Sequence, residues 1–206
     1  MKATATAVTT VDAERPDAAP LGRAARVLRG GGLVAFPTET FYGLGAAALD
    51  TAAVRRVFDV KGRPESRPLL VLVVSVLMVE RLAANISITA RQLMARHWPG
   101  ALTLVIPAAT TVPRELSAGT ATIGVRLSSH PVATGLVTAL GGPVTAPSAN
   151  VSDEAPPTTV ADVLAYFDDT IALVLDGGPT AGGPPSTVLD VTVEPPRVIR
   201  AGAVKV

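Results

Sequence analysis

Short apolar runs alternate along this chain with segments in which apolar residues recur at helical spacing. The helical spacing predicts helices over residues 21–29, 131–140 and 160–167, and further helices that begin at Asp50, Ser75 and Ser87. The short runs predict strands over residues 5–11, 33–36, 69–74, 101–106, 122–127, 143–146, 171–175, 187–193 and 198–200. This alternation is typical of an α/β domain in which helices surround a mixed sheet.

The pattern favours one domain, because the 206 residues show neither an internal repeat nor a second core. Residues 1–20 are expected to be a partly flexible extension with a short edge strand, and residues 21–206 to form the catalytic domain. The N-terminal stretch lacks the apolar core of a secretion signal. The longest apolar run, residues 68–79, is shorter than the ~20 residues that cross a bilayer. We therefore expect a cytoplasmic protein without a membrane segment.

Composition excludes several kinds of chemistry. The chain has no cysteine, so disulfides, thiolate nucleophiles and cysteine zinc sites are excluded. His97 and His130 lie far apart in the sequence and are expected to be solvated or to cap helices. We find no phosphate-loop, His-Glu-x-x-His or Gly-x-Ser-x-Gly signature, and we expect no metal site made of protein side chains.

Positive charge is concentrated in one part of the chain. Residues 55–126 hold ten Lys or Arg against four acids, whereas residues 127–196 hold eight acids and no Lys or Arg. Within the basic part, Lys61 and Arg63 follow a predicted helix and could simply offset the negative end of its dipole. They also suit a polyphosphate, whose charge must be neutralised before a nucleophile reaches phosphorus. We expect both to be accessible cations in a cavity.

Two further polar groups follow predicted strands. Ser148 and Asn150 come after an apolar strand, and Ser186 follows a Gly-Gly-Pro-Pro stretch. Turn formation would explain such residues, but strand ends are also where open α/β sheets bind ligands. The segment Gly43-Leu44-Gly45 fits a dinucleotide fingerprint only loosely, because the preceding strand is predicted to end at Phe36. Its glycines instead indicate a backbone that passes close to a ligand or to another chain segment.

Taken in order, the motifs of the chain closely resemble those of the YrdC/Sua5 family of threonylcarbamoyl-AMP synthases, from about Leu21 onwards. The resemblance rests on residues 37–45 (PTETFYGLG), 61–64 (KGRP), 98–103 (WPGALT), 125–127 (VRL), 147–150 (PSAN), 176–178 (DGG), 186–187 (ST) and 200–202 (RAG). It implies a single-domain form of the family, with a twisted, open mixed sheet and helices around a basic central cavity.

The resemblance also implies roles for nine residues. It assigns the ATP side of the site to Lys61, Arg63, Ser148, Asn150, Ser186 and Arg200, of which Lys61 and Arg63 would be catalytic. It assigns the threonine side to Thr38, Tyr42 and Arg126, with Arg126 facing the carboxylate. Mg²⁺ is expected to be held mainly by the ATP phosphates. The chain departs from some relatives at Leu72, where they have a histidine, and at Asp153, where glycine is common and loop geometry is at stake.

The implied reaction is that of a nucleotidyltransferase, which condenses L-threonine, bicarbonate or CO₂, and ATP into threonylcarbamoyl-AMP and pyrophosphate. A separate transferase complex would then modify tRNA, and direct tRNA binding by this chain is expected to be weak or absent. One alternative is a double-stranded RNA or ribosome-binding module that uses the basic face. Another is a carbamoyl-adenylate step in cofactor maturation, which usually needs zinc-finger and acylphosphatase-like domains that this chain is not expected to have.

Overall fold

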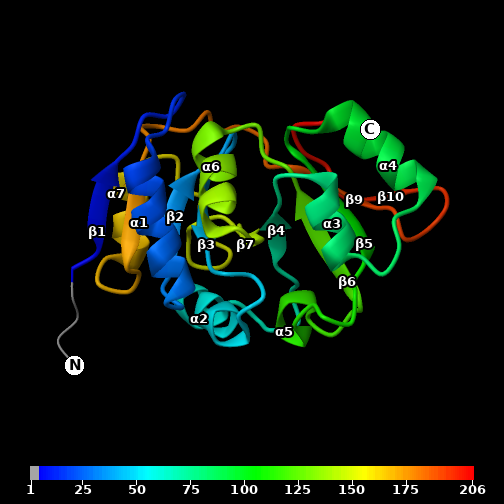
Figure 1. The fold of residues 1–206 in the computed structure, drawn as a ribbon, viewed down its shortest axis with the longest axis horizontal. Coiled ribbons are helices and arrows are strands. Elements are labelled where there is room, and N and C mark those ends of the chain that lie inside the picture. Colours follow the sequence, from blue (N-terminus) through cyan, green and yellow to red (C-terminus); the bar gives the residue numbers. More distant parts are fainter. Residues whose placement is uncertain (1–4) are drawn as a thin grey trace.

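The structure is a computed structural model that describes residues 5–206, in which strands and helices alternate as predicted (Figure 1). The helices are α1 (Ala18–Arg29), α2 (Thr51–Lys61), α3 (Val76–Leu82), α4 (Ile88–His97), α5 (Arg114–Ser117), α6 (Pro131–Leu140) and α7 (Val160–Phe167). The strands are β1 (Ala7–Thr10), β2 (Val34–Pro37), β3 (Tyr42–Gly45), β4 (Leu70–Leu72), β5 (Leu102–Pro107), β6 (Thr122–Arg126), β7 (Val144–Thr145), β8 (Leu173–Asp176), β9 (Thr187–Asp190) and β10 (Arg197–Arg200). None of the described helices is both long and apolar enough to cross a membrane.

The strands form two mixed sheets that meet edge to edge. One sheet has the order β1-β8-β2-β3, and the other has the order β10-β9-β5-β6-β4-β7. Each contains parallel and antiparallel pairs, for example β2 with β8 and β2 with β3. Isolated bridges join β3 and its neighbours to the β7 region, at Gly43 with Ser148 and at Ala47 with Val144. The α/β fold with a mixed sheet is therefore confirmed, in two joined parts.

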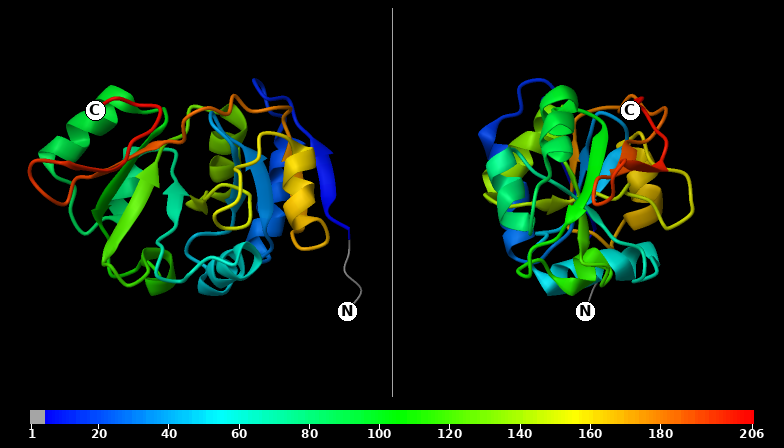
Figure 2. Two further views of the ribbon diagram at one scale, coloured as in Figure 1. Left: turned by 180° about the vertical axis from the view of Figure 1, so that it is seen from behind. Right: turned by 90° about the vertical axis from the view of Figure 1, so that its right-hand side faces the viewer.

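Alternate residues of the four-stranded sheet enter two apolar clusters on its opposite faces. Val34 and Phe36 of β2 pack in the cluster that contains the buried residues of α1 and α6. Ala35, between them, belongs to the cluster that contains Val163 and Phe167 of α7. Period-two alternation places successive strand side chains on opposite faces, and Figure 2 shows helices on both sides of the sheets. The single core expected from sequence is thus two apolar layers of one fold.

Helix starts were predicted well because their capping side chains are in the sequence. Asp50 accepts hydrogen bonds from the main-chain N–H groups of Ala52 and Ala53 at 2.9 and 3.1 Å. Ser75 and Ser87 cap α3 and α4 in the same way. The bounds of α6 and α7 agree with the prediction, whereas α1 begins three residues early and includes Pro20. Proline is tolerated there because first-turn N–H groups have no helical acceptor.

Strand β3 and the short helix α5 were not predicted. Two of the four residues of β3 are glycine, which weakens the strand signal. The glycine at position 45 is explained by crowding, since a Cβ there would lie 2.8 Å from Phe36 Cε1 and 2.9 Å from Val144 Cγ1. These two neighbours belong to the two sheets, so the backbone at Gly45 passes close to other chain segments, one of the two expected possibilities.

We predict that Gly45→Ala lowers the free energy of unfolding by about 1–3 kcal/mol, the usual cost of overpacking a filled core. Urea denaturation followed by circular dichroism measures the change. Gly142→Ala is the matched control, because a Cβ at that position meets nothing within 4 Å. If the two variants were equally stable, the junction of the sheets would have room for a methyl group.

Candidate functional site

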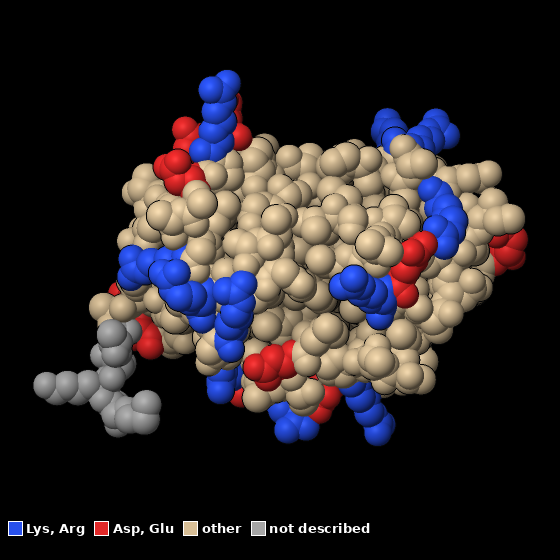
Figure 3. Space-filling model, in the orientation of Figure 1, with Lys and Arg blue, Asp and Glu red and all other residues tan. Residues whose placement is uncertain are grey.

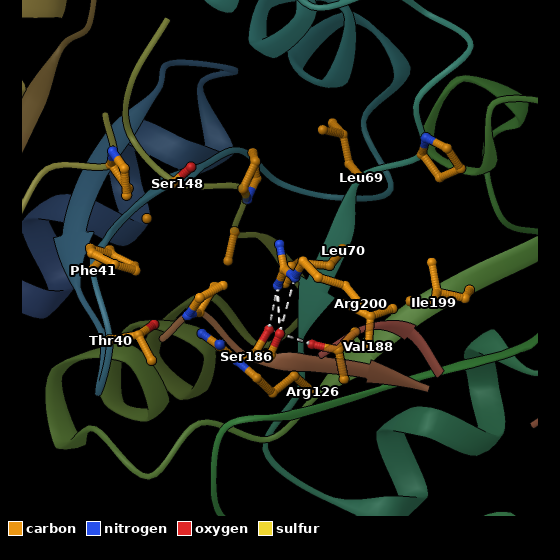
Figure 4. Close-up of a pocket in the computed structure, with 18 of the residues that line it drawn as sticks. Thr40, Phe41, Leu69, Leu70, Arg126, Ser148, Ser186, Val188, Ile199 and Arg200 are labelled. Atoms are coloured by element: carbon orange, nitrogen blue, oxygen red, sulfur yellow. Dashed lines mark hydrogen bonds between the residues drawn. The ribbon is translucent and has the colours of Figure 1, made fainter. Parts of the chain in front are cut away.

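A cavity of about 790 Å³ lies where the two sheets meet, and both contribute to its wall. This volume lies within the range of small-molecule and cofactor sites. Residues 38–43, around the start of β3, form one side, and strands β4, β5, β6, β9 and β10 form the other. Figure 4 shows Thr40, Phe41 and Ser148 across the cavity from Arg126, Ser186 and Arg200. The cavity therefore brings together residues that are far apart in sequence.

Eight of the nine predicted site residues line this cavity. They are Thr38, Tyr42, Arg63, Arg126, Ser148, Asn150, Ser186 and Arg200. Lys61 does not line it. The other charged residues of the wall are Arg197, Glu154 and Asp190, so four arginines stand against two carboxylates.

Thr38 and Tyr42 are buried and already hydrogen-bonded within the protein. The Thr38 hydroxyl donates to the main-chain oxygen of Phe41 at 2.7 Å and accepts from the N–H of Thr40 at 3.2 Å. The Tyr42 hydroxyl donates to the main-chain oxygen of Gly178 at 2.7 Å. Burial, and then the charge of Asp176, raise the pKa of Tyr42 to about 12. These bonds fix the orientation of both hydroxyls, and the Tyr42 hydroxyl stays protonated with its oxygen lone pairs left to a ligand.

Arg126 ends β6 and is buried, with 3% of its surface exposed. Its Nε lies 3.8 Å from Glu39 Oε1, and among the described residues neither of these buried atoms has a hydrogen-bond partner. Burial lowers the pKa of Arg126 and the Glu39 carboxylate opposes this effect, but a guanidinium remains charged in proteins. A buried charged donor without an acceptor is costly. Arg126 is therefore suited to receive an anionic ligand from the cavity.

Ser186 and Arg200 form a rigid pair on the same wall. Arg200 Nη2 donates to the main-chain oxygen of Ser186 at 2.7 Å and to its hydroxyl at 3.0 Å. The hydroxyls of Ser186 and Thr103 are 3.0 Å apart. Burial lowers the pKa of Arg200, and the nearby charge of Arg126 lowers it further. Two guanidinium groups that repel each other in one cavity favour an anion between or beside them.

Lys61 takes a position that the sequence did not indicate. It is buried, with 2% of its surface exposed, and its ammonium donates to the main-chain oxygens of Ser148, at 2.6 Å, and Asn150. Burial, and then the charge of Arg63, lower the pKa of Lys61 to about 8. The expectation that Lys61 is an accessible cation is wrong, because the end of α2 packs against the 148–150 loop. In this conformation Lys61 holds that loop in place.

Arg63 is the member of the pair that reaches the cavity. Gly62 ends α2 in the left-handed region, with φ 55°, and so turns the chain between the two cations. Arg63 Nε and Nη2 donate to the main-chain oxygens of Arg67 and Pro68 at 3.0 and 2.9 Å. Burial, and then the charge of Arg67, lower the pKa of Arg63, while Asp153 opposes them. These two bonds fix the direction of its guanidinium.

Asn150 organises the loop that carries Ser148. Its Nδ2 donates to the main-chain oxygens of Val151 and Glu154 at 2.7 and 2.8 Å, while its Oδ1 is buried without a partner within residues 5–206. Asp153 adopts φ 69°, a left-handed conformation that glycine favours and aspartate tolerates. The loop therefore keeps a glycine-like turn despite the departure at this position. Leu72 is buried in the apolar layer around α1 and α6 and does not line the cavity.

Sequence reasoning missed a network behind Arg126. Ser128 Oγ donates to Glu39 Oε2 and accepts from the main-chain N–H of His130 at 3.2 Å. His130 Nδ1 in turn accepts from Val132 N–H and caps α6, so one of the two expected histidine roles is confirmed. Glu39 lies in the PTET motif, which the sequence singled out as part of the site. The sequence did not show that Glu39 itself stays out of the cavity lining. No group of three or more His, Asp or Glu in the described part of the chain could hold a metal.

Residues 26–202 match the family model Sua5_yciO_yrdC, which carries the description "Telomere recombination". A threonylcarbamoyl-AMP synthase of Pyrococcus abyssi is 46% identical over 179 residues, which are 87% of this chain and 53% of that protein. One of Bacillus subtilis is 41% identical over 185 residues, 89% of this chain and 54% of that protein. The chain belongs to the Sua5/YciO/YrdC family. It spans about half the length of these two curated relatives.

Solved structures of the family agree with the fold. The crystal structure of Pyrococcus abyssi Sua5 complexed with L-threonine matches with a TM-score of 0.93 and 44% identity, over 96% of this chain and 58% of that one. Escherichia coli YciO matches with a TM-score of 0.89 and 25% identity, over 97% of both chains. The expected family fold is therefore confirmed over nearly the whole chain.

We predict that the His130 cap makes stability depend on pH. Burial lowers the pKa of His130 below its ordinary 6.5, although Glu39 opposes the shift, so the unfolded state binds the proton more readily. The contribution of His130 is thus complete above pH 6.5 and is lost as pH falls through the folded pKa. His130→Asn keeps a capping side chain but does not titrate. From about pH 7 to about pH 5, the melting temperature of His130→Asn should fall less than that of the wild type. Equal falls would contradict the assignment.

Proposed function

We propose that this chain is an L-threonylcarbamoyladenylate synthase, which condenses L-threonine, bicarbonate or CO₂, and ATP. The observation that carries the proposal is Arg126, a buried cation that lines the same cavity as Arg63 and Arg200. An amino-acid carboxylate in the cavity would pair with its guanidinium. The proposal draws further support from the relatives named threonylcarbamoyl-AMP synthase and from the Sua5 crystal structure with L-threonine.

The two ends of the substrate set would occupy opposite parts of the cavity. Arg126 would bind the threonine carboxylate, and Thr38 and Tyr42 would lie beside its polar groups. The nucleotide would lie along polar and cationic residues that line the cavity, namely Arg63, Ser148, Asn150, Ser186 and Arg200. In this arrangement Lys61 would act at the phosphates only if its ammonium left the carbonyl oxygens that it now binds.

The proposed reaction needs no protein nucleophile. The neutral amine of threonine attacks the carbon of CO₂, and its released proton passes to solvent, giving a carbamate. A carbamate oxygen then attacks the α-phosphorus of ATP. The bond between this phosphorus and the oxygen that bridges it to the β-phosphorus breaks as pyrophosphate leaves. The protein's part is positioning and charge neutralisation. Because the described residues offer no metal-ligand set, Mg²⁺ would be held by the ATP phosphates, and no step here uses it.

A large nucleic-acid surface is less well supported. On the face shown in Figure 3, Lys and Arg stand in separate small groups, and Asp or Glu lies beside several of them. Binding to a phosphate backbone requires an extended basic surface. The downstream transferase and a cytoplasmic site of action follow from the proposed chemistry rather than from any contact in this structure.

We predict that pyrophosphate release requires ATP, threonine and bicarbonate together. Serine should be a poorer substrate than threonine by about 10–200-fold in kcat/KM, the discrimination that one methylene-sized contact usually provides. A coupled pyrophosphate assay measures both effects, with valine as the isosteric control that lacks the hydroxyl. Equal rates with all three amino acids, or release without bicarbonate, would refute the proposed function. Tight tRNA binding at physiological salt that ATP does not disturb would favour the RNA-binding alternative.

We predict that Arg63→Ala lowers kcat/KM by about 100-fold, the usual cost of removing one charge-stabilising donor from an active site. Its free energy of unfolding should fall by only about 1 kcal/mol per hydrogen bond lost. The matched control is Arg91→Ala, which removes an exposed cation of α4 that pairs with Glu80 of α3. A large loss of stability with retained turnover would make Arg63 a structural residue.

A further inference from the structure

Gly202 lies at a point where the chain can carry no side chain. After β10 the chain turns back, and residues 200–204, here called the return segment, lie against residues 185–187. A Cβ at Gly202 would be 2.2 Å from the main-chain oxygen of Pro185 and 2.6 Å from both Ser186 C and Thr187 N. All three are backbone atoms, so no side-chain rotation could relieve the clash. Glycine is therefore required by the closeness of the two backbones.

Hydrogen bonds hold the return segment in this position. Ala203 N–H donates to the main-chain oxygen of Pro185 at 2.9 Å. The Thr187 hydroxyl donates to the main-chain oxygen of Val204 at 2.6 Å and accepts from Val204 N–H at 3.1 Å. Together with the Arg200 bonds to Ser186, these contacts attach both ends of the return segment to residues 185–187.

The residues that the return segment contacts form part of the cavity wall. Pro185, Ser186 and Arg200 line it, and the Ser186 hydroxyl also contacts Thr103 on the neighbouring strand β5. On the other side, Thr187 N–H donates to the main-chain oxygen of Ala101 at 3.0 Å. Residues 185–187 are thus held between β5 and the return segment. The direction of the Ser186 hydroxyl and of the Arg200 guanidinium depends on both neighbours.

We propose that Gly202 is a positioning residue, which lets the return segment hold Ser186 and Arg200 against the cavity wall. Gly202 itself contacts no ligand. Any larger residue would push the return segment away from residues 185–187 and stretch the Arg200 bonds to Ser186. The catalytic consequence rests on the proposed function, in which these two residues serve the nucleotide. The structural consequence stands without it.

The test is Gly202→Ala, examined by two independent measurements. Hydrogen exchange should show lost protection at the amides of Ala203 and Val204, while Val174, in the other sheet, keeps its protection. In the pyrophosphate assay, KM for ATP should rise about tenfold or more, because misplacement of this size is expensive in an active site. KM for threonine should change much less. Gly142→Ala, which meets no neighbour, should match the wild type in every readout.

Thr187→Val provides a second variant that adds no bulk. It removes the hydroxyl that bonds Val204 in both directions, so it should produce the same changes in smaller measure. If the wild type released no pyrophosphate, the proposed function would be refuted. The structural role of Gly202 would then be tested by hydrogen exchange alone. Wild-type protection together with wild-type affinity for ATP in Gly202→Ala would overturn the inference. A rise in KM for threonine equal to that for ATP would also contradict it.

Discussion

The close pairing of β3 with residues 144–149 is the constraint on which the site depends. Leu44 N–H donates to Pro147 O, and Ala149 N–H donates to Tyr42 O, each at 2.8 Å. Together with the bridge between Ala47 and Val144, these bonds join the edges of the two sheets. Because each sheet supplies one side of the cavity, a shift at this junction would move the two sides relative to each other. The filled space around Gly45 makes such a shift unfavourable.

The junction also explains why one buried cation, Lys61, is bound within the protein while another, Arg126, is available to a ligand. Burying a charge is costly unless it is paired or hydrogen-bonded. Lys61 meets this requirement with two carbonyl oxygens of the loop that follows the junction, so the protein itself satisfies it. Arg126 meets it only in part, since its ion pair with Glu39 is long, at 3.8 Å, and its Nε has no hydrogen-bond acceptor within residues 5–206. Both cations are buried, but only Arg126 lines the cavity, so it is the better guide to a ligand.

Sequence predicted every described helix except α5, and most strands, because their signals are local. Caps such as Asp50 and the spacing of apolar residues act within a few positions. Strand β3 lacks such a signal because two of its four residues are glycine, although it forms a local hairpin with β2. The same distinction applies to the site. Motifs identified which residues gather at the cavity, but not that Lys61 points into the protein, or that Glu39 and Ser128 stand behind Arg126.

Most polar groups of the cavity are positioned before any ligand arrives. Thr38, Tyr42 and Arg200 each bond to main-chain oxygens, and such bonds fix side-chain direction at little entropic cost to binding. This suits a reaction whose rate depends on placing three reactants in line rather than on a protein nucleophile. At Gly45 and Gly202 the neighbouring atoms leave no room for a Cβ. These glycines lie close in sequence to Tyr42 and Arg200, and they allow the segments that carry those residues to pack closely against the rest of the chain.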